Sequence, residues 1–134
     1  MTATQIETDL APKPLSSFSQ GVHASGRIVQ VSGCGSLNPA TAEVIHLGDV
    51  AAQVVATLDI VKGILEAGGA TFSDVIMLRV YLTDRSDFAA MNAAYEKYIG
   101  ENVSGVKPCR TTLMVGLPLE GMLVEIDALA VIPD

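Results

Sequence analysis

The sequence contains few aromatic residues and few cysteines, so neither large aromatic side chains nor disulfides can be the main source of its stability. Tryptophan is absent, aromatic residues make up 4% of the chain, and cysteine occurs only as Cys34 and Cys109. We therefore expect an interior built mainly from Val, Ile, Leu, Ala and Met, with both cysteines as free thiols. No run of about twenty apolar residues occurs, which argues against a membrane-spanning helix.

Basic residues are also scarce, since eight Lys and Arg face fifteen Asp and Glu, for a net charge of -7. Binding to nucleic acid or to an anionic membrane requires clustered positive charge, so we expect neither as a partner. The first ten residues contain Glu7 and Asp9 and lack a basic start followed by an apolar stretch. They do not resemble a secretory signal, and a cytoplasmic location is expected by default.

The length of 134 residues suits one domain, and 49% of the residues are hydrophobic. The mean hydropathy of +0.42 leaves more apolar surface than a small monomer easily buries, which favours oligomerisation. Residues 1–14 carry Pro12 and Pro14 and show no periodicity. We predict a flexible N-terminal arm over residues 1–14 and a single folded domain over residues 15–134.

Periodicity along the domain predicts two helices among five or six strands. Apolar residues at Val50, Val54, Leu58, Val61 and Leu65 fall on one face of a helix that Asp49 can cap and Gly68–Gly69 can end. A second helix follows Asp84, with Phe88, Met91, Tyr95 and Tyr98 on one face. Strands are expected over residues 18–24, 27–32, 75–82, 109–115 and 122–131, with a brief one possible over 43–45.

This order, ββαβαββ, predicts an α+β domain in which both helices pack on one face of the sheet. Ser25–Gly26 is expected to join the first two strands as a hairpin, and a second hairpin is expected at the other end of the chain. The continuously apolar strand over 75–82 suits a central position covered on both faces.

Polar residues in the last two strands are the candidates for function. In the final strand Glu125 and Asp127 share one face, opposite a wholly apolar one, so both carboxylates should point away from the helices. Arg110, at the start of its strand, could hold an acidic substrate, because its planar fork donates two parallel hydrogen bonds to a carboxylate. The alternative is an ion pair from Arg110 to Glu125 or Asp127 across the sheet. Arg79 is expected to form a structural pair.

Other chemistries have less support. His23 and His46 have no Glu or Cys at a ligand spacing, so we expect no metal site. Cys34 lies in a Ser-Gly-Cys-Gly turn and is interpreted as a small buried residue rather than a nucleophile. The glycines beside it lack the following helix and lysine of a phosphate-binding loop. Composition and pattern therefore lead to an acidic α+β domain with one well-placed Arg and one Glu.

Several segments, taken in order, resemble the reactive-intermediate deaminase (RidA/YjgF) family from about Pro14 to Val131. They are Ser19-Gln-Gly-Val22, Val31-Ser-Gly33, Leu37-Asn-Pro39, Ala52-Gln53, Glu66-Ala-Gly68, Val80-Tyr-Leu-Thr-Asp84, Met91-Asn-Ala93, Pro108-Cys-Arg110, Leu117-Pro118 and Val124-Glu-Ile126. The resemblance implies a chorismate-mutase-like fold and a homotrimer, whose sheets form a central barrel with three clefts between subunits. It also implies that no metal or organic cofactor is needed.

By the same resemblance, Arg110 binds the substrate carboxylate and Glu125 orients or deprotonates the attacking water. Ser32, Gly33 and Asn92 match positions that line the pocket, and Phe18 and Thr112 occupy two more. The implied reaction is hydrolysis of a 2-imino or 2-enamino acid, such as 2-aminoacrylate, to a 2-keto acid and ammonia. It is the reaction of a 2-iminobutanoate/2-iminopropanoate deaminase, a hydrolase of metabolite damage control.

Three departures from the family pattern keep other functions open. Phe18 stands where well-characterised members have Tyr, Thr112 where Cys is frequent, and Cys34 where Gln is frequent. These changes favour either a pathway-specific deaminase, for example one acting on aminomuconate, or a non-catalytic trimer that binds 2-keto acids or acts like a chaperone. Retention of Glu125 favours catalysis, because carboxylate binding gains nothing from a second negative charge. A ribonuclease role fits poorly with the net charge of -7.

Overall fold

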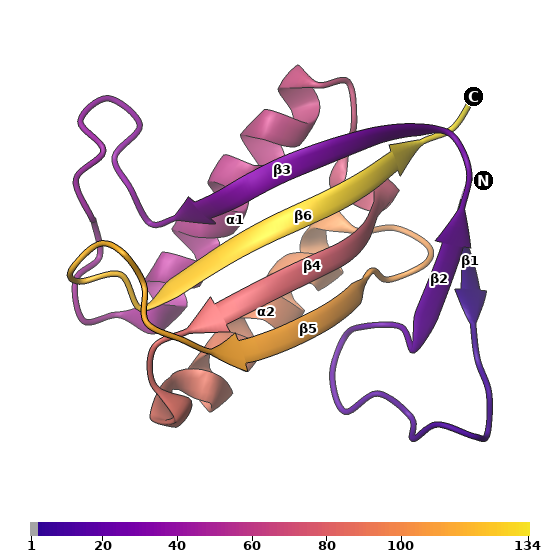
Figure 1. The fold of residues 1–134 in the computed structure, drawn as a ribbon, viewed down its shortest axis with the longest axis horizontal. Helices are drawn as coiled ribbons and strands as arrows, with labels where there is room; N and C mark the ends of the chain where they lie inside the picture. Colours follow the sequence, from indigo (N-terminus) through magenta and orange to yellow (C-terminus); the bar gives the residue numbers. More distant parts are fainter. Residues whose placement is uncertain (1–2) are drawn as a thin grey trace.

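The computed structural model describes residues 3–134 as a four-stranded sheet with two helices on one face (Figure 1). The sheet has the order β3-β6-β4-β5. Its strands are β3 (Arg27–Gly35), β4 (Val75–Leu82), β5 (Cys109–Met114) and β6 (Val124–Ile132). The helices are α1 (Val50–Ala67) and α2 (Phe88–Asn102), and two short 3-10 turns, η1 (Phe72–Asp74) and η2 (Arg85–Asp87), precede β4 and α2. The predicted α+β class is confirmed, and no described helix is long and apolar enough to cross a membrane.

Helix α1 begins and ends where its sequence predicts, whereas the predicted cap Asp84 belongs to the turn η2, and α2 begins at Phe88 and ends at Asn102 rather than near Gly100. The carboxylate of Asp49 accepts a hydrogen bond of 3.0 Å from the Ala52 backbone N–H at the start of α1, and α1 ends before Gly69, which has a φ of +86°. Asp84 accepts one of 2.8 Å from the Ser86 backbone N–H in η2. Hydrogen bonds from Ser86 hold the pKa of Asp84 below its usual range.

One face of the sheet packs on the helices and the other is open. Leu78, Val80 and Leu82 of β4 are fully buried against the helices, whereas Arg79 on the opposite face is exposed. Strand β6 follows the same alternation, with Val124, Ile126, Ala128 and Ala130 buried beneath the helices. The expected direction of the two carboxylates of β6 is therefore confirmed. Within residues 3–134 only one face of the central strand β4 is covered, so the cover expected on its other face is not supplied by the same chain.

Neither predicted hairpin is present. Strand β6 lies between β3 and β4 and is antiparallel to both, so it does not pair with β5, which runs parallel to β4. Strand β2 (Gly21–Ala24) pairs with β1 (Ala3–Ile6) rather than with β3. A periodic pattern identifies a strand but not its partner, because pairing depends on contacts between distant segments. The brief strand expected over 43–45 is reduced to an isolated bridge between Leu37 and Val44.

The predicted N-terminal arm is partly structured. Ala3–Ile6 forms β1 with β2, while Met1 and Thr2 lie outside the described residues. Gln20 organises the loop between the two strands, since its side-chain amide donates to the carbonyls of Thr8, Ala11 and Pro12 and its oxygen accepts from the Thr8 N–H at 2.8 Å. The arm is therefore hydrogen-bonded to β2 and to Gln20, both of which lie beyond residue 14, where the sequence predicts the arm to end.

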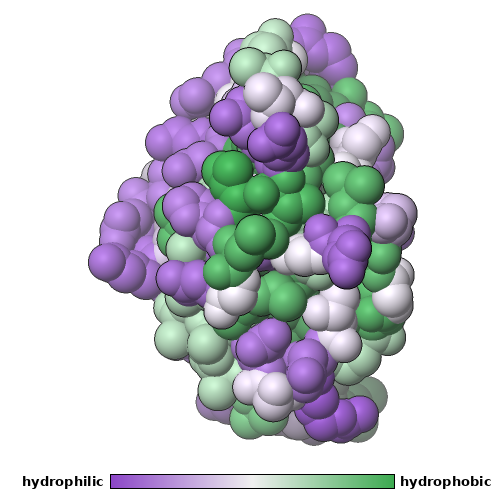
Figure 2. Space-filling view, turned by 90° about the vertical axis from the view of Figure 1, so that its left-hand side faces the viewer, coloured by the Kyte–Doolittle hydropathy of each residue, from purple (hydrophilic) through white to green (hydrophobic). Residues whose placement is uncertain are grey.

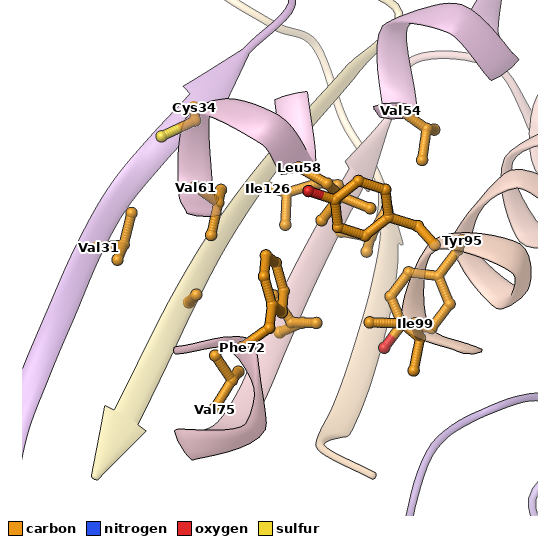
Figure 3. Packing of buried hydrophobic residues seen from close by; sticks show 14 of the residues in the cluster. Val31, Cys34, Val54, Leu58, Val61, Phe72, Val75, Tyr95, Ile99 and Ile126 are labelled. Atoms are coloured by element: carbon orange, nitrogen blue, oxygen red, sulfur yellow. The ribbon is translucent and has the colours of Figure 1, made fainter. Parts of the chain in front are cut away.

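The core lies between the sheet and the helices (Figure 3). Figure 3 shows Val54, Leu58 and Val61 of α1 lying beside Ile126 of the sheet and Tyr95 of α2. All five side chains are fully buried, and each buried aliphatic side chain contributes about 1.5–3 kcal/mol through removal from water.

Leu58→Ala should lower the free energy of unfolding by about 2–5 kcal/mol, because it leaves a cavity where α1 meets the sheet. Ile64→Ala is the matched control on the same helix, since Ile64 is 43% exposed while Leu58 is 0% exposed. Urea unfolding followed by circular dichroism measures both. Equal losses for the two variants would contradict this account of the core.

Candidate active site

Arg110 lies on β5 and faces the helices. It pairs in register with Leu78, whose side chain is buried beneath them, so the guanidinium reaches toward α2. Its Cζ atom lies 4.7 Å from the ring centroid of Tyr95, 5.1 Å from that of Phe18 and 5.9 Å from that of Phe88. Three aromatic rings thus surround one cation, an arrangement that attracts the charge while removing water from it.

Asn92 orients the guanidinium. Its side-chain oxygen accepts a hydrogen bond of 2.7 Å from Nη1 of Arg110. The hydroxyl of Ser16 lies 2.9 Å from the same oxygen and 2.8 Å from a carboxylate oxygen of Glu96. Among residues 3–134, Asn92 is the single hydrogen-bond acceptor of Arg110, so most of its five N–H donors are available for a ligand.

Burial changes the electrostatics of this group. Desolvation lowers the pKa of Arg110 from its usual value, while Tyr95 and Glu96 oppose that shift. A guanidinium that has lost hydration without gaining a carboxylate partner gains more from an incoming anion than one exposed to water. The site is therefore suited to hold a carboxylate.

Two residues with buried hydroxyls lie near Arg110: Thr112, which is close in the sequence, and Tyr95, whose ring contacts the guanidinium. Thr112 follows Arg110 by two residues on the same face of β5, and its Oγ1 has no hydrogen-bond partner among the described residues. The hydroxyl of Tyr95, whose ring contacts Arg110, is likewise buried without a partner there, and burial raises its pKa. Unsatisfied buried hydroxyls are uncommon, and a water or a ligand can satisfy them.

Glu125 lies on the opposite, open face of the sheet. A register shift between Val31 and Cys34 places Ser32 and Gly33 in a bulge of β3. A Cβ atom at Gly33 would overlap the carboxylate of Glu125 where it now lies, so any side chain at this position would displace that carboxylate. The structure therefore brings Gly33 and Glu125 together, with Ser32 adjacent.

The polar residues thus form two groups rather than one cleft. Arg110, Asn92, Phe18 and Thr112 lie on the helix side or at its edge, whereas Ser32, Gly33 and Glu125 lie on the open side. The predicted alternative of an ion pair from Arg110 to Glu125 or Asp127 is wrong. Asp127 instead accepts a hydrogen bond of 2.8 Å from Arg79 and another of 2.8 Å from the hydroxyl of Tyr81. The structural pair expected for Arg79 is confirmed, and it raises the pKa of Arg79.

Sequence reasoning missed part of the surroundings of Arg110. Phe88 and Tyr95 were interpreted only as the buried stripe of a helix, although both rings also contact the guanidinium. Ser16 and Glu96 carry no signal in a single sequence. No group of three potential metal ligands is found in the part of the chain from Ala3 onward.

Comparison with known proteins connects these groups to a family. The family model described as Endoribonuclease L-PSP matches residues 8–132. The chain belongs to the RidA/YjgF family. A RutC family protein of Pyrococcus horikoshii is 39% identical over 125 residues, covering 93% of this chain and 94% of its own. The 2-iminobutanoate/2-iminopropanoate deaminase of Escherichia coli is 37% identical over 126 residues, covering 94% and 95%.

Solved structures of family members share this fold. The Rid family protein YyfB from Yersinia pestis superposes with a TM-score of 0.86 at 28% identity, covering 98% of this chain and all of its own. Escherichia coli TdcF with bound serine gives a TM-score of 0.71 at 32% identity, covering 96% and 98%. These structures match this chain over nearly its whole length. One relative in the family is named as a deaminase of 2-imino acids.

Proposed function

We propose that this protein hydrolyses 2-imino and 2-enamino carboxylic acids to 2-keto acids and ammonia. The observation that carries the proposal is Arg110, a desolvated guanidinium with unused donors on a chain 37% identical to a deaminase of such substrates. Arg110 binds the substrate carboxylate through its planar fork, and Asn92 keeps the fork in orientation.

The base comes from the group on the open face of the sheet, which consists of Ser32, Gly33 and Glu125. The carboxylate of Glu125 takes a proton from water as the hydroxide oxygen adds to the carbon of the C=N bond. The nitrogen of the resulting adduct takes up the proton held by Glu125 and a second proton released by the new hydroxyl, so that it leaves as ammonia while the hydroxyl oxygen becomes the keto oxygen. An enamine first takes a proton on carbon to become the imine. A positioned base contributes about 10²–10⁴-fold to such a step.

Because Arg110 and Glu125 lie on opposite faces of one chain, we propose that the complete site forms between two copies in a trimer. The uncovered sheet face supports such an assembly. Figure 2 shows further apolar side chains gathered on the side where the loops over 36–49 and 115–123 meet, where Leu47 is 71% and Leu119 44% exposed.

Ammonia release tests the proposal directly. An L-amino-acid oxidase generates 2-imino acids in situ, and the wild type should accelerate their hydrolysis above the spontaneous rate for several side chains. The absence of acceleration with every 2-imino acid would overturn the deaminase proposal.

A second candidate function is binding without turnover. The bound serine in TdcF and the missing hydroxyl at Phe18 favour it, because a ligand's carboxylate can be held without an activated water. A 2-keto acid that binds in calorimetry, through Arg110, to a protein that releases no ammonia would support this candidate. A pathway-specific deaminase would instead act on a single imino acid.

Gly33→Ala tests whether the position of the Glu125 carboxylate matters for catalysis. The added methyl group displaces the carboxylate of Glu125, so kcat should fall about tenfold while stability changes little, because the carboxylate end can move. Gly63→Ala is the control, since nothing lies within 4 Å of a Cβ atom there and alanine favours the helix. Steady-state kinetics and thermal unfolding of both variants make the comparison, and equal kcat values would argue against a catalytic Glu125.

A further inference from the structure

One fully buried polar side chain belongs to neither group of the candidate site. Gln53 of α1 is 0% exposed, and both polar atoms of its side chain are hydrogen-bonded. Its amide nitrogen donates to the His46 carbonyl at 3.2 Å and to the Gly121 carbonyl at 3.0 Å, and its oxygen accepts from the Leu123 N–H at 2.9 Å. A buried amide is costly unless its donors and its acceptor all find partners, so all three bonds matter.

These bonds join two loops that are far apart in the chain. His46 lies in the loop from β3 to α1, and Gly121 and Leu123 lie in the loop from β5 to β6. Figure 1 shows both loops at the same end of the sheet. The loops also touch directly, since a Cβ atom on Gly121 would overlap the Leu47 side chain. Gln53 thus forms a clamp, made of its three hydrogen bonds, between α1 and both loops.

Glu125 lies where these loops meet the sheet. It is the second residue of β6, and it pairs with Gly35, the last residue of β3. The Met122 side chain packs on Gly35 so closely that a Cβ atom there would overlap it. The ends of strands open more readily than their middles, so the Glu125 backbone depends on what holds Leu123, two residues before it.

We propose that Gln53 is a positioning residue, which fixes Leu123 and both loops and thereby holds the Glu125 carboxylate where it meets the attacking water. Because Gln53 is 0% exposed, it acts through Glu125 and does not contact the substrate. A displacement of about 1 Å can cost about 10²-fold in rate, so loss of the clamp should lower kcat more than it changes substrate binding. This role rests on the function proposed above.

Gln53→Met tests the role, because it nearly keeps the length of the side chain and removes all three hydrogen bonds. We expect kcat to fall about tenfold while KM for a 2-imino acid changes less than about twofold. Leu65→Ala is the control for lost stability, since Leu65 is also 0% exposed but lies near the other end of α1. Its kcat should match that of the wild type at a temperature where thermal unfolding shows both variants to be folded. If Gln53→Met does not fold, Gln53→Asn, which keeps an amide on a shorter side chain, replaces it.

A double variant with Glu125→Gln separates positioning from a general loss of structure. If Gln53 acts through the Glu125 carboxylate, Gln53→Met should change kcat less than about twofold once that carboxylate is gone. The same fractional loss of kcat in both backgrounds would overturn the positioning role. An unchanged kcat in the folded single variant would overturn it as well.

Hydrogen exchange followed by NMR tests the clamp without reference to activity. In Gln53→Met the Leu123 amide should exchange at least about tenfold faster than in the wild type, measured relative to the Ala128 amide in the middle of β6. Equal relative exchange in the two proteins would overturn the clamp. A wild type that releases no ammonia would overturn the proposed function, and with it the catalytic role of Gln53, but would leave the exchange result unaffected.

Discussion

Arg110→Ala is expected to lower kcat/KM for 2-imino acids by about 10²–10⁴-fold, mainly through KM. Two charge-assisted hydrogen bonds to the substrate carboxylate are lost at once, and each contributes about 1.5–3 kcal/mol where water is excluded. Arg110→Lys keeps the charge but not the planar fork, and should therefore recover only part of the loss.

Folding must be separated from binding in this comparison. The guanidinium stacks on three aromatic rings, so Arg110→Ala also removes packing beside Phe18, Phe88 and Tyr95. Thermal unfolding of each variant controls for that effect, and 2-keto acid affinity measured by calorimetry should fall in parallel with kcat/KM. Unchanged kinetics in a folded Arg110→Ala variant would remove this residue from the site.

Glu125→Gln is expected to lower kcat by about 10²–10⁴-fold with little change in KM, because the amide keeps the shape but cannot accept a proton from water. A site shared between copies makes a sharper prediction. Arg110→Ala and Glu125→Gln each abolish every site, yet a mixed assembly contains interfaces where one copy supplies an intact Arg110 and its neighbour an intact Glu125.

With equal amounts and random assembly, half of the copies carry each intact residue, so about a quarter of the sites, one half times one half, are complete. Mixing the two inactive variants by co-refolding should thus restore about a quarter of the wild-type activity. Native mass spectrometry confirms that mixed oligomers form. Mixed oligomers without activity would show that Arg110 and Glu125 do not act together across an interface.

Much of the local structure could be predicted from the sequence. The spacing from Val50 to Leu65, the cap at Asp49 and the stop at Gly68–Gly69 together define α1, because these signals are local and act within one or two turns. The alternation in β6 likewise identifies which side chains face the helices. The resemblance of scattered motifs identifies the family, and Arg110 and Glu125 are candidates from their positions in strands.

Only the tertiary structure decided how these parts relate. Alternation divides the residues of one strand between two faces. It does not show which residues of a neighbouring strand lie on the same face of the sheet. The registers of Leu78 with Arg110 and of Tyr81 with Glu125 put the two functional groups on opposite sides of the sheet. The choice of β1 rather than β3 as the partner of β2 is of the same kind. Strand pairing and register depend on contacts between residues far apart in the chain, whereas sequence periodicity reports only the burial of each segment by itself.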